Sequence, residues 1–486
     1  MSTPTRKRSN QKKTVYRSNI AEIPPNTWEG LDLSNQGLRN ISPEIFEHTF
    51  IRELNLDGNQ IKEIPSEISK LEYLEIISAS NNKLWRLPPE ICKCKNLKTL
   101  DLSDNHLSSI PLELGNLYQI EHLDLDKNPL IEPFSSVYKN RGGIGLISFC
   151  REHNLLYPEP FERQWMLINL NYEERELIKI GSYNILAARC CNAKNYPFLP
   201  LNTLKPEWRF ESILNEIMTY NVDILSLQEL ENMTYKSLFS TTLEDKCFYD
   251  SVFFPKSRIK ALSPLDKESV DGCVIFWKKN LFKLIEQKNI EFVKLIAEHP
   301  LMSKYEDILI RNSDKDNIAV MILLEKINKD QLIIVNAHLH WNHEFSDIKL
   351  LQSVVLLEEI SKFKKKYPKA GIVLCGDFNS LKDSEVISFI KNGQSEIKMK
   401  EDFLKFEHKL KMIDTHENID FPFTHFHVKF KALIDYILCT DNIGVEKILL
   451  PPNSDYFDSI IALPTVHFPS DHLFIGAEVY LKKNKD

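Results

Sequence analysis

The sequence predicts an α/β protein in two parts: an N-terminal solenoid of short repeats, then a sandwich of two packed β-sheets flanked by helices. Two observations carry this prediction. The first third of the chain repeats itself every 23 residues, and from Leu177 onward apolar runs alternate with helical or loop segments. A chain of 486 residues also exceeds one comfortable core, which favours more than one domain.

The repeats share one pattern. The strings LDLSNQGL, LNLDGNQI, ISASNNKL, LDLSDNHL and LDLDKNPL place Gln36, Asn59, Asn82, Asn105 and Asn128 at the same position. This L-x-L-x-x-N-x-L pattern is that of a leucine-rich repeat, in which each L-x-L is a short strand on a concave face. We expect the Asn side chains to form a ladder that satisfies backbone groups at the turns. Such curved surfaces usually bind proteins, and a purely structural spacer is the alternative.

Changes in composition give the predicted boundaries. Residues 1–20 form a basic tail, which is either a solvated disordered segment or a nuclear-address or RNA-contacting arm. Residues 21–152 hold the repeats, capped by a helix in RGGIGLISFC. Residues 153–176 are a linker rich in Pro, Glu and Tyr, and residues 177–486 form the large α/β domain.

The overall composition is that of an ordinary soluble globular protein, with 43% hydrophobic and 27% charged residues. The net charge of −7 argues against a general nucleic-acid coat protein but leaves room for a local basic groove. Nine irregularly spaced cysteines favour reduced, intracellular thiols. No apolar window is long enough to span a membrane, so we expect a cytoplasmic protein, with the nucleus left open.

Several apolar runs of the second part end in polar residues, namely LSLQE, VNAHLH, IVLCGDFN and IDYIL, and PSDH precedes the last run. Runs of this length predict buried strands, whose polar ends then meet at one rim of a sheet. The residues concerned are Glu229, His338, Asp377, Asn379, Asp435, Asp471 and His472. Carboxylates, an amide and imidazoles at one place suit magnesium-assisted phosphodiester cleavage.

Two of these residues have specific expected roles. Glu229 ends a run that should otherwise be buried, where an unpaired carboxylate would cost on the order of several kcal/mol, so we expect it to bind metal. His472, with Asp435 as its partner, should contact the scissile phosphate, because a carboxylate on one ring nitrogen favours the imidazolium. A surface charge is the alternative for Glu229, and a surface or core histidine is the alternative for His472.

The motifs SYNIL, LQE, KDNI, NAHLHW, CGDFNS, IDY and SDH, in this order, resemble the endonuclease–exonuclease–phosphatase superfamily of magnesium-dependent phosphodiesterases. FFPKSR, VDGCVIFWK and AHLHWNHEFSDIKLLQ are similar to segments of the carbon-catabolite-repressor deadenylases. Leucine-rich repeats ahead of such a domain narrow the resemblance to the catalytic subunits of the Ccr–Not deadenylase complex. It covers nearly the whole chain from about Ile20 onward.

This resemblance implies a 3′-to-5′ exoribonuclease that shortens poly(A) and releases 5′-AMP with two Mg²⁺. It implies that Asp377 engages metal and activates water, that Asn379 holds the nucleophile or phosphate, and that His338 contacts phosphate. Asn184 would orient a ligand or water, and Asp471 would reach a metal. The repeats would dock a Caf/Pop-type deadenylase subunit and, through it, the Not scaffold.

The substrate residues follow from the same resemblance. Phe430 matches the position that stacks on adenine, while Asn317, Lys256 and Arg258 are candidates to contact the RNA. His343 stands where the family has a proline that shapes the base pocket. Two alternatives remain open. One is another phosphodiesterase of the superfamily, acting on abasic DNA, nucleotides or phosphoinositides, and the other is a repeat scaffold with an RNA-binding domain.

Overall fold

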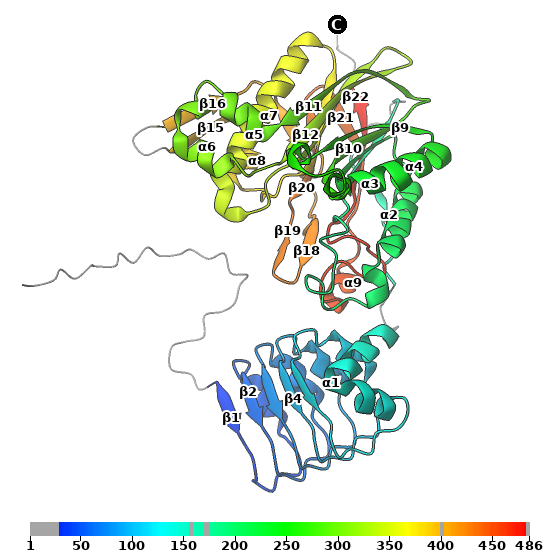
Figure 1. Ribbon diagram of the computed structural model, residues 1–486, viewed down its shortest axis with the longest axis vertical. Helices are drawn as coiled ribbons and strands as arrows, with labels where there is room; N and C mark the ends of the chain where they lie inside the picture. The colour runs from blue at the N-terminus through cyan, green and yellow to red at the C-terminus, as the bar shows by residue number, and fades with distance from the viewer. Residues whose placement is uncertain (1–28, 155–158, 170–174, 399–402, 483–486) are drawn as a thin grey trace, which may run out of the picture. The chain divides into compact units, whose positions relative to one another are not determined.

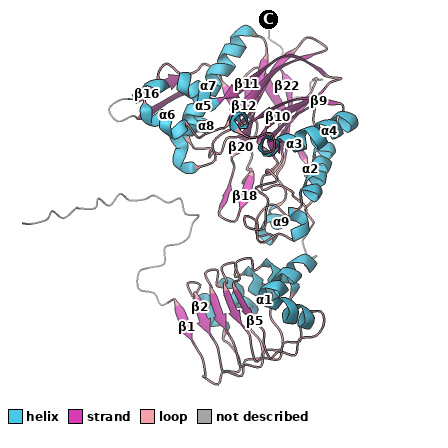
Figure 2. Cartoon of the chain, in the orientation of Figure 1, coloured by secondary structure: helices cyan, strands magenta, loops and turns pink. Residues whose placement is uncertain are grey.

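The computed structural model describes residues 29–154, 159–169, 175–398 and 403–482 (Figure 1, Figure 2). The predicted basic tail, residues 1–20, lies outside them. The chain divides into two compact units: one runs to Ile110 and from Ile120 to Ile144, and the other contains Pro111–Gln119 and the chain from Gly145 onward. All nine cysteines are free. Within the described part, every helix is too short or too polar to cross a bilayer.

The first unit is the expected array of leucine-rich repeats. Each repeat contributes one three-residue strand to a parallel sheet with the order β1-β2-β3-β4-β5. Inward-facing residues such as Leu54, Ile77 and Leu100 are fully buried. The strands are β1 (Gly30–Asp32), β2 (Glu53–Asn55), β3 (Ile76–Ser78), β4 (Thr99–Asp101) and β5 (His122–Asp124). Short 3₁₀ turns follow the strands, and helix α1 (Phe134–His153) contains the predicted cap.

The asparagine ladder is confirmed. Asn82 is typical, because its Nδ2 donates to the carbonyl of Leu56 in the preceding repeat at 2.9 Å and its Oδ1 accepts from the amide of Ile61 at 3.0 Å. Asn59, Asn105 and Asn128 repeat this arrangement. The Nδ2 of each residue also donates to a carbonyl of its own repeat, so each side chain joins two successive repeats and fixes their spacing.

Charged residues just ahead of the strands pair with one another. Glu75 accepts from Arg52 Nη1 at 2.6 Å and from Lys98 Nζ at 2.6 Å, and Arg52 also contacts Glu29 at 3.2 Å. All four side chains are partly exposed. Most of the charge in this row is therefore neutralised within the solenoid.

The second unit is the expected sandwich of two sheets. The seven-stranded sheet has the order β6-β21-β22-β7-β8-β10-β9, and the six-stranded sheet has the order β11-β12-β13-β14-β20-β17. The strands of the first are β6 (Trp165–Leu167), β7 (Ile178–Asn184), β8 (Ile224–Glu231), β9 (Tyr249–Pro255), β10 (Asp271–Lys278), β21 (Ile443–Leu449) and β22 (Ile475–Leu481). Those of the second are β11 (Phe282–Glu291), β12 (Ile318–Lys326), β13 (Gln331–His338), β14 (Gly371–Asp377), β17 (Met412–Asp414) and β20 (Asp435–Thr440).

Apolar cores lie between the two sheets and on their outer faces. Ile180 and Ile275 of one sheet pack with Val320 and Val373 of the other between the sheets. Helices cover the two outer faces (Figure 1). Those over the six-stranded sheet are α5 (Phe292–Glu298), α6 (Glu306–Asn312), α7 (Ser346–Lys366) and α8 (Glu385–Asn392). Those over the seven-stranded sheet are α2 (Pro206–Tyr220), α3 (Asn232–Thr234) and α4 (Ser240–Cys247).

The remaining elements are short. The hairpins are β15 (Gln394–Lys398) with β16 (Phe403–Glu407) and β18 (His425–His427) with β19 (Phe430–Ala432), and α9 spans Ser454–Ser459. Strand β6 lies inside the segment expected as a linker, residues 153–176. It pairs with β21, so Trp165–Leu167 is an edge strand of the sandwich.

Candidate active site

Strands from both sheets end at one rim of the sandwich and carry polar side chains there. β7 and β8 are parallel neighbours in one sheet, and β13 and β14 are parallel neighbours in the other. Because the carboxyl ends of parallel neighbours lie at the same edge, these strands bring together Asn184, Glu229, His338 and Asp377. β20 is antiparallel to β14 and begins at the same rim, with Asp435 opposite Asp377.

A β-bulge directs Glu229 into the site. Gln228 pairs with Cys273 and Leu230 pairs with Gly272, so Glu229 is an extra residue without a partner in the register. Its φ of 64° lies in the left-handed region, which non-glycine residues rarely adopt. Strain of this kind persists where the surrounding structure enforces it, and it is common at functional sites.

The amide of Asn184 links the two central carboxylates. Its Nδ2 donates to Glu229 Oε1 at 3.1 Å and to Asp377 Oδ2 at 3.0 Å. The second oxygen of Glu229 accepts from the amide of Ala187 at 2.9 Å. The two carboxylates, one from each sheet, therefore converge beside one amide.

Asp435, His472 and Asp377 form a buried row beside these groups. His472 Nδ1 lies 2.8 Å from Asp435 Oδ2, and His472 Nε2 lies 3.8 Å from Asp377 Oδ2. Burial opposes protonation of His472, but the charge and hydrogen bond of Asp435, together with Asp377, raise its pKa to about 10. Burial and the charge of Asp435 raise the pKa of Asp377 to about 7. The imidazole of His472 is therefore a cation at neutral pH.

Asn379 follows β14 and supports Asp377 through its backbone. Its amide donates to Asp377 Oδ1 at 2.8 Å, and its side-chain Nδ2 donates to the carbonyl of Leu339 at 3.1 Å. The chain is not extended here, because Asn379 has a φ of 48°. Lys349 Nζ donates to the Asn379 carbonyl at 2.6 Å and so holds this turn.

His338 lies between the two carboxylates. Its Nε2 is 3.6 Å from Asp377 Oδ2 and 3.9 Å from Glu229 Oε1. Burial and the nearby charge of Lys256 lower its pKa to about 4, so the ring is neutral at pH 7. Asn317 lies beside His338, because its Nδ2 donates to the His338 carbonyl at 3.1 Å.

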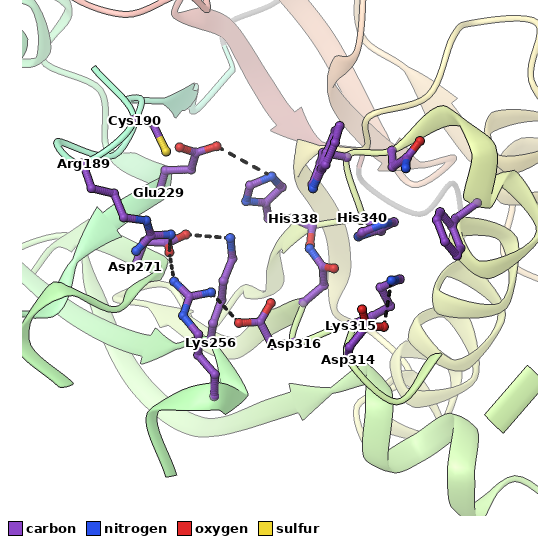
Figure 3. A pocket seen from close by; sticks show the side chains of 15 residues that line it. Arg189, Cys190, Glu229, Lys256, Asp271, Asp314, Lys315, Asp316, His338 and His340 are labelled. Carbon is purple, nitrogen blue, oxygen red and sulfur yellow. Dashed lines mark hydrogen bonds and ion pairs between the residues drawn. The ribbon is translucent and has the colours of Figure 1, made fainter. Parts of the chain in front are cut away.

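A cleft of about 560 Å³ opens beside Glu229 and His338 (Figure 3). Lys256 and Arg258, the candidates for RNA contacts, line this cleft, but both are bound to the buried Asp271, at 2.7 and 2.5 Å. Arg189 also pairs with Asp271, and Arg258 also pairs with Asp316. Lys256, Arg258 and Arg189 thus form a cationic wall anchored by Asp271.

Asp271 and Arg189 were not predicted from the sequence. For Asp271 a signal exists, because it is a single acid at the start of the apolar run GCVIFW. For Arg189 the sequence offers no comparable signal.

Three predicted residues lie toward the edges of the site. Asp471 faces Tyr196, whose hydroxyl donates to Asp471 Oδ2 at 2.7 Å, and His425, whose Nε2 lies 3.3 Å from that oxygen. Phe430 is about half exposed on β19, and its ring centroid lies 5.5 Å from that of His425. His343 is exposed at the start of a 3₁₀ turn (His343–Phe345), next to residues that line the cleft.

The sequence also does not predict the buried polar residues that support the site. Arg209 donates from Nη2 to the Ile185 carbonyl at 2.6 Å and from Nε to the Pro469 carbonyl at 2.9 Å, which joins the segments carrying Asn184 and His472. Arg209 shares the buried face of α2 with Ile213 and Ile217, and an arginine at this helical spacing is a usable signal.

A second buried network joins the two sheets. Asn336 Oδ1 accepts from Gln228 Nε2 at 2.8 Å, and Asn336 Nδ2 donates to the carbonyls of Leu227 and Val274, each at 2.8 Å. Gln228 and Asn336 are fully buried. Since Gln228 directly precedes the bulged Glu229, the network fixes the base of the bulge.

The donor set fits a hard divalent cation. Glu229 and Asp377 offer carboxylate oxygens at one point, and such oxygens are the ligands that Mg²⁺ prefers. Asp435 Oδ1 is buried and has no hydrogen-bond partner among the described residues. The carboxylates of Glu229, Asp377 and Asp435 therefore carry negative charge that their hydrogen-bond donors do not fully neutralise, and a bound cation would neutralise it.

Comparisons with known proteins agree with this fold. The model of the Endonuclease/Exonuclease/phosphatase family matches residues 181–472, and two leucine-rich-repeat models match residues 50–71 and 72–130. The crystal structure of ANGEL2, a 2′,3′-cyclic phosphatase, in complex with adenosine-2′,3′-vanadate is similar, with a TM-score of 0.54 and 25% identity. That similarity covers 66% of this chain and 99% of ANGEL2.

Two curated relatives match nearly the whole chain. Both are named probable CCR4-Not complex 3′-5′-exoribonuclease subunit Ccr4. The protein from Vairimorpha ceranae (strain BRL01) is 45% identical over 479 residues, covering 98% of this chain and 99% of that protein. The protein from Encephalitozoon cuniculi (strain GB-M1) is 46% identical over 464 residues, covering 94% and 93%.

Proposed function

The chain belongs to the Ccr4 family of CCR4-Not 3′-5′-exoribonuclease subunits, and on that basis we propose that it removes poly(A) from the 3′ end of messenger RNA. The products would be 5′-AMP and a shortened RNA, and the cofactor would be Mg²⁺, with two ions per site. The observation that carries this proposal is the meeting of Glu229, Asp377 and the cationic His472 at one rim.

Each residue has a role that its surroundings support. Glu229 and Asp377 would hold the metal, with Asn184 orienting both carboxylates. Bound magnesium would stabilise negative charge on the phosphate and favour deprotonation of the attacking water. Asp377 would also be placed to accept a proton from the attacking water, because its carboxylate lies beside the proposed metal position.

The histidines would act on the phosphate. His472 keeps its proton at neutral pH, and Asp435 occupies its Nδ1, so Nε2–H is the group that donates to a phosphate oxygen. The neutral His338 would provide a second contact, and Asn379 would hold the nucleophile or the phosphate. Lys256, Arg258 and Asn317 would bind RNA in the cleft, with Asp471 at the edge of the metal site.

Metal dependence and the ligand set are tested together by AMP release from oligo(A). Wild-type protein should be active with Mg²⁺ and inactive with EDTA, and Glu229→Gln should abolish release without unfolding the protein. Glu231→Gln, on the same strand, is the matched control and should stay active. Turnover by Glu229→Gln close to the wild-type rate would contradict the assigned site.

Adenine selection would depend on Phe430, whose exposed ring offers a surface for stacking. Phe430→Ala should raise KM for oligo(A) more than it lowers kcat and should reduce the preference over oligo(U). Introducing the family residue with His343→Pro should increase that preference. RNA ending in a 2′,3′-cyclic phosphate is a needed third substrate, because the ANGEL2 similarity makes phosphatase activity the second candidate.

The repeats would bind the Caf/Pop-type subunit through the concave sheet and so connect the enzyme to the Not scaffold, with the cytoplasm as the main location. Ser78 and Asp101 lie at equivalent strand positions and are partly exposed. Ser78→Arg with Asp101→Arg should weaken binding of that subunit and leave AMP release by the isolated protein unchanged. Full binding by this double variant would argue against the concave surface.

A further inference from the structure

A second cluster of possible metal ligands lies beside the candidate active site. His425, Asp471 and His472 each offer one ligand atom, and these three atoms lie within 4.8 Å of one another. The Asp471 and His472 side chains are buried, and the His425 side chain is 13% exposed. His425 has no role in the proposed reaction, so its place in this cluster needs a separate explanation.

The spacing suits two ligands of one ion better than a strong ion pair. His425 Nε2 and Asp471 Oδ2 are 3.3 Å apart, whereas a charge-assisted N–H···O bond is about 2.7–2.9 Å long. Two ligands at about 2.0–2.1 Å from a tetrahedral zinc lie about 3.3 Å apart. In addition, Asp471 Oδ1 and His425 Nδ1 are buried and make no hydrogen bond to any described residue.

Neighbouring groups already orient these side chains as they would around a metal. Asp435 binds Nδ1 of His472 at 2.8 Å, which leaves Nε2 as its ligand atom, and Tyr196 donates to Asp471 at 2.7 Å. A carboxylate behind a histidine and a donor behind a carboxylate are the outer partners typical of metal sites. The backbone adds rigidity, because His425 and His472 form an isolated antiparallel bridge.

We propose that His425, Asp471 and His472 form a binding site for Zn²⁺ or a similar borderline divalent cation. Two imidazoles and one carboxylate favour zinc, whereas the oxygen set at Glu229 and Asp377 favours magnesium. The three ligands leave one tetrahedral position for water. Zinc here would displace the proton from Nε2 of His472, release it to water, and so inhibit RNA cleavage. This inhibition rests on the proposed function, whereas zinc binding itself does not.

Binding is tested by calorimetric titration of the full chain with Zn²⁺ in the presence of excess Mg²⁺, and by Co²⁺ absorption spectra as a probe of tetrahedral coordination. His425→Asn should lose one zinc equivalent or bind it at least about 10-fold more weakly. His427→Asn is the matched control on the same strand, and it should bind zinc as the wild type does. Thermal melts establish folding, and His425→Gln serves if His425→Asn is unfolded.

Inhibition is a separate measurement. Zn²⁺ should inhibit AMP release by the wild type and His427→Asn at concentrations at least about 10-fold lower than for His425→Asn, each relative to its own zinc-free rate. Equal zinc affinity and stoichiometry in wild type and His425→Asn would overturn the site. If no variant released AMP, the proposed function would fail, and the titration would still decide whether zinc binds.

Discussion

Asp377 and Asp435 lie directly opposite each other at the ends of the antiparallel strands β14 and β20. Like charges in this arrangement repel, and burial removes the water that would screen them. The raised pKa of Asp377, about 7, is the direct consequence. The rim is therefore an electrostatically unfavourable part of the fold, and a proton or a cation stabilises it.

Neutralising Asp377 should stabilise the protein while inactivating it. In EDTA at pH 8, Asp377→Asn should raise the free energy of unfolding by about 1–2 kcal/mol, because the repulsion and the burial of charge are removed. The pKa of Asp377 is higher in the folded state than in the unfolded state. Ionisation of Asp377 therefore lowers the stability of the wild type as pH rises. The stability gained by the variant should therefore shrink as pH falls from 8 toward 4.

Urea denaturation measures the free energy of unfolding at each pH, with the exposed Asp420→Asn as the control variant. A less stable Asp377→Asn would contradict this account.

Asp435 should set the pH range over which His472 remains a cation. Asp435→Asn removes the negative charge that raises the pKa of His472, so the imidazolium should lose its proton at lower pH. We expect kcat/KM to fall at least about 10-fold at pH 8, with the alkaline limb of the pH–rate profile displaced toward neutrality. The profile of AMP release from oligo(A) measures this shift. If the alkaline limb of the profile did not change, protonation of His472 would not be required for the reaction.

Asn336 should matter for both stability and catalysis. Asn336→Leu leaves Gln228 and the carbonyls of Leu227 and Val274 without their partners in the core, which should cost about 2–4 kcal/mol. Because Gln228 precedes the bulged Glu229, kcat should fall even at temperatures where the variant is fully folded. The exposed Asn328→Leu is the control. Full activity in folded Asn336→Leu would show that this network does not position Glu229.

His416 should make the protein sensitive to mild acid. It is buried, and burial together with the charge of Arg163 lowers its pKa to about 4. Because the pKa of His416 is lower in the folded state than in the unfolded state, protonation favours unfolding. The free energy of unfolding should therefore be highest above pH 6.5 and should fall by up to about 3 kcal/mol as pH falls toward 4. His416→Gln should lose less stability across this range than the wild type, and His343→Gln should behave like the wild type. Parallel pH dependences for wild type and His416→Gln would rule out His416.

The sequence predicts the architecture well because its signals are periodic. The 23-residue repeat defines the solenoid, and apolar runs that end in Glu229 and Asp377 predict the shared rim. The strand β6 is missed because three residues, Trp165–Leu167, are too few for a pattern. The orientation of Asp471 is missed for a different reason: Tyr196 and His425, which it faces, are brought there only by the tertiary fold.

The conformation around the catalytic candidates is harder to predict than their identity. Residues two apart, such as Asp377 and Asn379, share a side of an extended segment, but the positive φ of Asn379 turns its side chain to the carbonyl of Leu339. The Asp271 cluster likewise depends on cations from separate segments, Arg189 and Arg258. Such contacts are set by packing between elements, which one sequence does not encode in local patterns.

Glu229 is one residue more than the pairing of β8 with β10 requires. If its codon were deleted, Gln228 and Leu230 would stand side by side against Cys273 and Gly272, and the ladder would run on without interruption. Chemistry on this scaffold can thus be gained or erased by an in-frame insertion or deletion of three nucleotides. A homologue that lacks this residue would keep the fold but lose the activity. The number of residues in this strand therefore indicates activity in a homologue better than overall sequence identity does.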